Sequence, residues 1–163
     1  MIFTSDNGAL DPRRGGSGSN LPLRGHKGTT WEGGMRVPCI ARWPGRIAPG
    51  RTTAEVATAM DLHPTLAALC GAALPADRAI DGRDIGALLL DVDGTARSPH
   101  EVFLYYRMND LEALRSGRWK LRFAEAGVEH RALHDLEADP GETTDVLADH
   151  LDVAARLDAL ADA

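Results

Sequence analysis

Asp6 and Asn7 are the first residues whose types suggest chemistry, and they stand side by side in the string Ser5-Asp6-Asn7-Gly8. Carboxylate and amide oxygens are the donors that hard cations such as Ca²⁺ and Mg²⁺ prefer, and adjacent donors can share one ion where the backbone turns between them. Asp and Asn also favour plain turns, because their side chains hydrogen-bond nearby backbone. The pair is therefore a candidate metal site, with an ordinary turn as the alternative.

A second candidate is the string Arg24-Gly25-His26-Lys27-Gly28, where potential cations stand among glycines. Glycine lets the backbone approach a ligand closely, and a Lys ammonium is a compact charge that suits an oxyanion. Basic residues are frequent between Arg13 and Arg51, and Glu32 is the single acid in that stretch. This pattern favours a small anionic ligand, with a flexible basic loop as the alternative. His26 has no partner in the sequence that would make it a base.

Two further pairs are interpreted as structural. Glu32 and Arg36 are spaced to form an ion pair at the base of the loop, where a charged pair more often sets geometry than performs chemistry. Cys39 and Cys70 stand in apolar surroundings and lack the spacing of metal ligands. We expect both cysteines to be buried thiols.

The elements that position these residues begin with a short strand at 1–4, which ends at the Asp6-Asn7 turn. In open α/β sheets, ligand sites lie beyond the carboxyl ends of strands. So few residues precede the turn that we expect the chain to begin inside an element. Residues 8–35 lack periodicity and are expected to form a functional loop. Further strands are expected at 37–43 and 56–60, and helices at 61–70, capped by Asp61 and ended by Gly71, and at 84–90.

The pattern changes after about Ser98. A strand is expected at 102–107, and residues 111–115 and 118–123 flank Ser116-Gly117, which is a hairpin signature. Residues 132–136 are expected to add a strand, and 149–160 a helix with Val153, Leu157 and Leu160 facing inward. These elements predict a small antiparallel sheet packed with a C-terminal helix.

Composition excludes some classes of function. The net charge of −6 argues against binding to nucleic acid, which needs a basic surface. No apolar run approaches the roughly 20 residues of a membrane-spanning helix, and no signal peptide is recognisable. The sequence assigns no cellular location.

Several strings, in order, resemble the sulfatase family of the arylsulfatase type. They begin with Phe3-Thr4-Ser5-Asp6-Asn7-Gly8 and the block from Leu21 to Pro38, which contains Gly25-His26-Lys27-Gly28-Thr29-Thr30-Trp31-Glu32-Gly33-Gly34. They continue with Trp43-Pro44-Gly45-Arg46-Ile47, Asp61-Leu62-His63-Pro64-Thr65-Leu66, Ile80-Asp81-Gly82, Arg118-Trp119-Lys120-Leu121 and the segment from Leu136 to Glu142. The resemblance covers almost the whole chain.

The resemblance implies the C-terminal part of an alkaline-phosphatase-like α/β fold. Residues 1–97 would belong to the catalytic domain and residues 98–163 to a small antiparallel subdomain. It implies hydrolysis of sulfate esters, of small molecules or sugars, with a divalent cation. Asp6 and Asn7 would ligate that cation, which is expected to be Ca²⁺, and Lys27 would contact the substrate sulfate.

The sequence departs from the family at the nucleophile, a formylglycine made from Cys or Ser in a Cys/Ser-x-Pro-x-Arg motif. Neither Cys39 nor Cys70 has that context, so we assign no catalytic residue and expect the isolated chain to be inactive. The interpretation is an N-terminally truncated sulfatase, and a non-catalytic fragment or subunit that pairs with an N-terminal sulfatase segment is the alternative. An in-frame motif upstream of Met1 would distinguish the two. A phosphoesterase of the same superfamily is disfavoured by the block around Lys27.

Overall fold

The computed structural model describes residues 1–11, 13, 15–16 and 18–162. Packing divides the chain into two units, each described here by itself. The first unit consists of residues 1–4 and 39–101, and the second of residues 5–38 and 102–163. The sequence assigns residues 1–97 to the catalytic domain and residues 98–163 to a small subdomain. That assignment stays a prediction.

The second unit contains the antiparallel sheet that the sequence predicts. Its strands lie in the order β3 (Phe103–Arg107), β4 (Asp110–Ser116), β5 (Trp119–Glu125) and β6 (Val128–Asp135). The hairpin between β4 and β5 turns at Gly117, whose φ of 58° is a left-handed conformation that glycine adopts without strain. The Ser116-Gly117 signature therefore predicted this connection correctly.

One face of the sheet packs on helix α4 (Leu151–Ala161), which follows the short 3₁₀ helix η3 (Leu147–Asp149). The core between them consists of Leu114, Leu121 and Leu133 from the strands with Ala154 and Leu157 from the helix. Val153 and Leu160 pack at its margin, as the helical spacing predicts. Full burial of one leucine contributes about 1.5–3 kcal/mol, so this face supplies much of the unit's stability.

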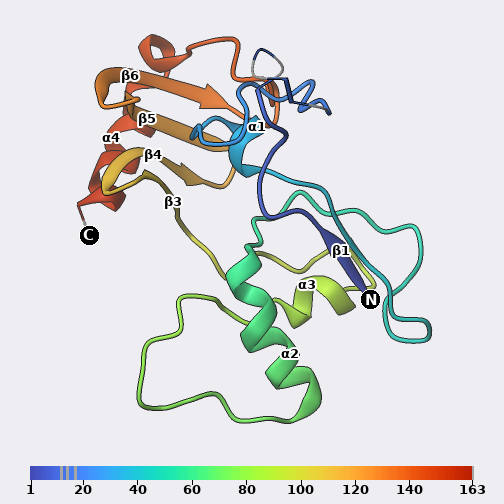
Figure 1. The fold of residues 1–163 in the computed structure, drawn as a ribbon. Coiled ribbons are helices and arrows are strands. Elements are labelled where there is room, and N and C mark those ends of the chain that lie inside the picture. Colours follow the sequence, from blue (N-terminus) through green and yellow to red (C-terminus); the bar gives the residue numbers. More distant parts are fainter. Residues whose placement is uncertain (12, 14, 17, 163) are drawn as a thin grey trace. The chain divides into compact units, whose positions relative to one another are not determined.

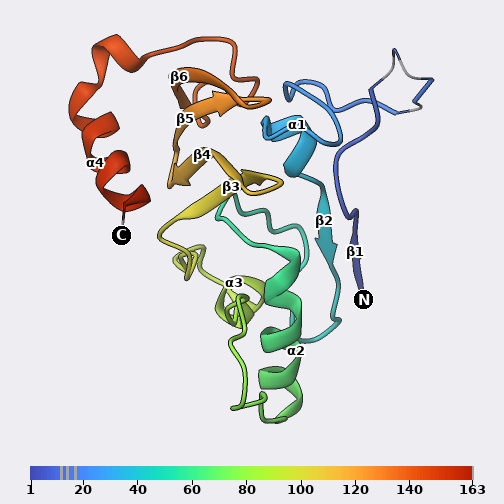
Figure 2. The same ribbon diagram turned by 60° about the vertical axis from the view of Figure 1, so that its left-hand side comes forward.

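The other face of the sheet is polar and yet buried. Because side chains alternate along a strand, Lys120 and Arg122 point away from Leu121 and its core, and both are fully buried. They meet the loop that leads into the one-turn helix α1 (Glu32–Met35). Figures 1 and 2 show α4 on one side of the sheet and α1 on the other.

The first unit contains a two-stranded antiparallel sheet, β1 (Ile2–Thr4) with β2 (Cys39–Ala41), in which Phe3 pairs with Ile40. It also contains helices α2 (Leu62–Cys70) and α3 (Gly86–Leu90). Gly71 ends α2 with φ 68°, as predicted. On α2, Pro64 and Thr65 are buried, whereas Leu66 is 48% exposed.

Two further expectations for the first unit are wrong. The strand expected at 56–60 is absent from the described residues, and the 3₁₀ helix η2 (Ala59–Asp61) lies there. The reason is local, because the Asp61 carboxylate accepts hydrogen bonds from the backbone N–H groups of Thr58 and Arg83, which stabilises a turn. Cys39 and Cys70 are exposed free thiols rather than buried ones, because β2 and the end of α2 present them at the surface.

None of the helices in the described ranges combines the length and the apolar character needed to cross a membrane.

Candidate functional site

The Asp6-Asn7 turn is held against the start of α1. The backbone N–H of Gly8 donates to the carbonyl oxygen of Gly34 at 3.1 Å. A Cβ atom on Gly8 would overlap the carbonyl oxygen of Gly33, so only glycine allows this approach. Asp6 is exposed and Asn7 is half-buried.

The loop that carries Lys27 is attached to the same turn. The N–H of Lys27 donates to the carbonyl oxygen of Ala9 at 2.9 Å. The side-chain amide of Asn20 joins both segments, since its oxygen accepts from Ala9 N at 2.7 Å and its nitrogen donates to the carbonyl oxygens of Ala9 and Gly25. The structure thus joins the Lys27 loop to the residue that follows the Asp6-Asn7-Gly8 string, and the Lys27 side chain is exposed.

The Lys27 loop is a tight turn built on two glycines. Gly25 and Gly28 have φ values of 85° and 88°, which other residues adopt only with strain. The Thr29 hydroxyl donates to the carbonyl oxygen of His26 at 2.8 Å, and it accepts from the His26 N–H at 3.2 Å. These bonds close the turn and present Lys27 at its tip.

His26 faces a cavity beside the loop. Its Nε2 atom lies 3.6 Å from the Asp11 carboxylate, and its Nδ1 atom lies 3.0 Å from the carbonyl oxygen of Lys27. The cavity has a volume of about 470 Å³, and its walls include Arg24 and Trp31. His26 therefore lines the concave surface beside Lys27, and its ring is held by neighbouring groups.

The oxygen atoms of Asp6 and Asn7 are of the type that a hard cation binds, but they are fewer than such a cation needs. Asp6 offers a carboxylate and Asn7 an amide oxygen, both of which suit Ca²⁺ or Mg²⁺. Within the described ranges there is no group of three or more His, Cys, Asp or Glu that could hold a metal ion. Because Ca²⁺ takes about 6–8 oxygen ligands, this turn supplies a fraction of a coordination shell.

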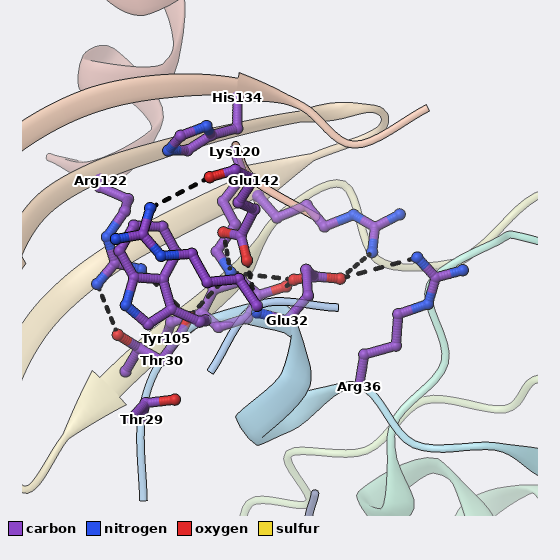
Figure 3. Close-up of polar contacts among 12 residues, drawn as sticks. Thr29, Thr30, Glu32, Arg36, Tyr105, Lys120, Arg122, His134 and Glu142 are labelled. Carbon is purple, nitrogen blue, oxygen red and sulfur yellow. Dashed lines mark hydrogen bonds and ion pairs between the residues drawn. The ribbon is translucent and has the colours of Figure 1, made fainter. Parts of the chain in front are cut away.

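Glu32 has closer partners than the Arg36 that the sequence paired with it. The Arg36 ion pair is present at 4.0 Å, but Lys120 Nζ lies 3.0 Å from the Glu32 carboxylate and the Tyr105 hydroxyl donates to it at 2.8 Å. Arg115 lies 3.5 Å away. Glu32 therefore joins the loop to the sheet mainly through Lys120 (Figure 3), whereas the sequence predicted a structural pair with Arg36 at the base of the loop.

The electrostatics of this contact follow from its burial. Burial alone would raise the pKa of Glu32, but the Lys120 ammonium and the hydrogen bonds from Lys120 and Tyr105 outweigh it and hold that pKa below its ordinary value. Burial, with the Glu32 charge next to it, raises the pKa of Tyr105 well above its ordinary value. Glu32 is thus a carboxylate and Tyr105 a neutral donor at neutral pH.

Sequence reasoning missed Lys120, Arg122 and Glu142 as parts of this region. A signal existed for the first two, because two cations at alternate positions of a strand whose other face is apolar must share one face. The guanidinium of Arg122 lies 3.8 Å from the ring centroid of Trp31, and that of Arg24 lies 3.6 Å from it. Nothing in the local sequence indicates that this face would be covered by a loop some 90 residues earlier in the chain.

Known proteins similar to this chain are sulfatases. Steryl-sulfatase of Mus musculus is 42% identical over an alignment 200 positions long, which covers 99% of this chain and 32% of that protein. Arylsulfatase A of Homo sapiens is 40% identical over an alignment 172 positions long, which covers 90% of this chain and 33% of that protein. Among solved structures, the PsFucS1 sulfatase from Pseudoalteromonas sp. matches with a TM-score of 0.78 and 33% identity, over 89% of this chain and 32% of that one.

The fold and these relatives define the class as sulfatase, and the expected α/β fold of the alkaline-phosphatase-like type is confirmed. A family profile described as "N-sulphoglucosamine sulphohydrolase, C-terminal" matches residues 26–160. The chain belongs to this family. It spans about a third of the length of the curated relatives it matches.

Proposed function

We propose that this chain forms part of a sulfate-ester hydrolase, in which Lys27 binds the sulfate group and Asp6 and Asn7 ligate a divalent cation. The observation that carries the proposal is the attachment of the Lys27 loop to the Asp6-Asn7 turn through Ala9 and Asn20. These contacts join segments about 20 residues apart and place an ammonium group and two oxygen donors on one loop assembly.

The chemistry of this arrangement suits a sulfate ester. Negative charge grows on the sulfate oxygens and on the leaving oxygen as the S–O bond breaks, and fixed positive charge at those oxygens lowers the barrier. Lys27, at the tip of its turn, supplies a compact ammonium for this purpose. The cation held by Asp6 and Asn7 would supply Lewis-acid polarisation of the sulfate, with Ca²⁺ as the expected ion.

Further parts of the site come from outside these residues in this proposal. Formylglycine, where the family has it, supplies the nucleophile. The two donors Asp6 and Asn7 leave most Ca²⁺ ligand positions to other groups. A sulfatase segment that carries a Cys/Ser-x-Pro-x-Arg motif would complete the site by pairing with this chain. Proteins similar to this one are named for steryl sulfates and for N-acetylgalactosamine 6-sulfate, and we propose a sulfate ester of a small molecule or sugar as the substrate.

Binding of inorganic sulfate to the 163-residue chain tests the assignment of Lys27. The chain contains two lysines, and Lys120 is fully buried whereas Lys27 is exposed. Reductive ¹³C-methylation, which keeps the charge, should therefore label Lys27 and the N-terminal amine. We expect sodium sulfate, at constant ionic strength, to shift the Lys27 methyl signal, and the signal itself to be missing from Lys27→Ala.

Hydrolysis is tested by co-expressing the chain with a sulfatase segment that carries the nucleophile motif. We expect turnover of an aryl sulfate that needs both parts and falls at least about 100-fold in Lys27→Ala, the scale of losing one charge-stabilising group. Activity unaffected by Lys27→Ala and by Asp6→Asn together would contradict the proposal.

A further inference from the structure

The loop that carries Lys27 rests on a cluster of buried charges that sulfate binding does not use. We define the Lys120 cluster as Lys120, Glu32, Glu142 and Thr30. The side chains of Lys120, Glu32 and Glu142 have no exposed surface, and Thr30 is 2% exposed (Figure 3). Fully buried Lys and Glu side chains are rare unless they are paired. The partners in this cluster include residues of the loop itself.

Three oxygen atoms surround the ammonium group of Lys120. Its Nζ atom lies 2.8 Å from the carbonyl oxygen of Thr30, 3.0 Å from a carboxylate oxygen of Glu32 and 2.9 Å from one of Glu142. The first two contacts are hydrogen bonds, and the third is an ion pair, since that Glu142 oxygen accepts no hydrogen bond. Two of these partners, Thr30 and Glu32, belong to the segment that directly follows the Lys27 turn.

Glu142 holds the same segment from a second direction. Its other carboxylate oxygen accepts the backbone N–H of Glu32 at 2.6 Å, and its carbonyl oxygen accepts from the Arg24 guanidinium at 3.2 Å. Arg24 and Glu32 stand on either side of Lys27 in the chain, so Glu142 contacts both ends of the loop. Glu142 has φ 52°, a left-handed conformation that is strained for a residue other than glycine. Such strain persists where surrounding contacts over-determine it and is commonest at functional sites.

The contacts of the Lys120 cluster restrain the two ends of the loop, whereas the residue at its tip is less restrained. Lys27 itself is exposed, and Gly25 and Gly28 on either side of it add little restraint of their own. In addition to the bonds from Ala9 and Asn20, the contacts that tie the loop to the sheet and to the turn at 139–142 lie at Arg24, Thr30 and Glu32. A binding group keeps its position to within a fraction of an ångström only where the supporting residues are themselves fixed.

Buried charges are also a weak way to gain stability. Replacing a buried ion pair by packed apolar residues is often neutral or stabilising, because taking the charges out of water offsets their attraction. Fixed directions and distances are what such a cluster supplies and what apolar side chains do not. The cluster is therefore better explained by the geometry it imposes on the loop than by its stability alone.

We infer that Lys120 and Glu142 are positioning residues for Lys27, through which the four-stranded sheet and the turn at 139–142 set the place of the sulfate-binding loop. The inference rests on the proposed role of Lys27, but its central claim, that the cluster orders residues 24–34, can be measured without sulfate.

The test uses the full 163-residue chain and the double variant Lys120→Met/Glu142→Gln. Lys120→Met alone would leave two buried carboxylates without their cation and can unfold the chain. The double variant removes one charge of each sign and leaves Glu32 its contact with Arg115. The matched control is Arg118→Met/Glu137→Gln, which removes one charge of each sign from an exposed pair 3.2 Å apart at the same sheet.

Two measurements are compared under conditions in which circular dichroism shows each variant to be folded. Amide hydrogen exchange should accelerate at least about tenfold at residues 29–34 of the double variant, and the amides of β4 and β5 should stay protected. Sulfate affinity, followed by the Lys27 ¹³C-methyl signal, should fall about tenfold or more, the usual scale for a residue that supports a binding group. The control should match the wild type in both.

The outcomes separate the two ideas. Faster exchange at 29–34 with no sulfate binding by the wild-type chain would support the positioning of the loop and count against Lys27 as a sulfate ligand in this chain. Unchanged exchange at 29–34 in the folded double variant would overturn the positioning inference. Unchanged sulfate affinity, where the wild type binds sulfate, would overturn it as well.

Discussion

Gly8 and Gly33 are packed so closely that a Cβ atom on Gly8 would overlap the carbonyl oxygen of Gly33. Gly8 directly follows the Asp6-Asn7 pair, and Gly33 lies in α1, just after the loop of Lys27. The contact therefore holds the Asp6-Asn7 turn against α1. Gly8 does not have a positive φ, so glycine is required at this position for space and not for an unusual backbone conformation.

Gly8→Ala should displace the Asp6-Asn7 turn from α1. The added methyl group meets backbone, which cannot rotate away, and overpacking of this kind typically costs about 1–3 kcal/mol. We expect a lower melting temperature and weaker sulfate binding, measured by thermal circular dichroism and by the Lys27 methyl signal. Gly45→Ala is the control, because Gly45 has φ 79° and open space around it, so that only backbone strain is added. Equal effects of the two substitutions on sulfate binding would refute the account.

Acid should destabilise the chain partly through Glu32. The pKa of Glu32 lies below its ordinary value of 4.5 in the folded chain, where burial opposes but Lys120 outweighs it. The unfolded chain therefore takes up this proton more readily, and the stabilisation is complete above pH 4.5 and is lost as pH falls through the folded pKa. Urea unfolding between pH 3 and 7 should show a steeper loss below about pH 4.5 for the wild type than for Glu32→Gln.

The comparison with Glu32→Gln cancels the contributions of other groups that titrate in the same range. Glu129→Gln serves as the control, since Glu129 is exposed. It should leave the acid slope of the wild type unchanged. A slope below pH 4.5 that is the same in the wild type and in Glu32→Gln would show that the Lys120 contact does not depress the pKa.

Asp61→Asn should destabilise the first unit. The Asp61 side chain is fully buried, and its carboxylate accepts from Thr58 N at 2.7 Å, Arg83 N at 2.8 Å and His100 Nε2 at 2.8 Å. An amide has one acceptor oxygen and would turn N–H groups toward donors, at a cost of about 2–4 kcal/mol. The control Asp77→Asn removes an exposed carboxylate that pairs with Arg78, and it should leave the melting temperature unchanged.

The 163-residue chain by itself should not hydrolyse an aryl sulfate, with or without Ca²⁺. The reason is chemical, because it contains no Cys or Ser in a Cys/Ser-x-Pro-x-Arg context and offers few of the ligands that Ca²⁺ needs. Release of the phenol from p-nitrophenyl sulfate is a direct assay. Turnover that disappears in Lys27→Ala would mean that the chain carries a complete site.

Local chemistry was readable from the sequence where neighbours in the chain decide the structure. The turn at Asp6-Asn7 and the hairpin at Ser116-Gly117 depend on glycine and on side chains that favour turns, and both appear at the predicted places. The strand expected at 56–60 failed for the complementary reason. Its short apolar pattern carried less weight than the hydrogen bonds from Thr58 and Arg83 to Asp61.

The sequence by itself determined the family motifs, the alternation along β5 and the residues that can meet a cation and an anion. Only the tertiary structure decided which partners the buried charges have. Glu32 was paired with Arg36 because the two residues are close in the sequence, yet in the fold it lies nearer Lys120, 88 residues away in sequence. Such pairing depends on how the sheet and the loop pack together, because a buried charge is stabilised by the opposite charges that lie next to it in the folded chain.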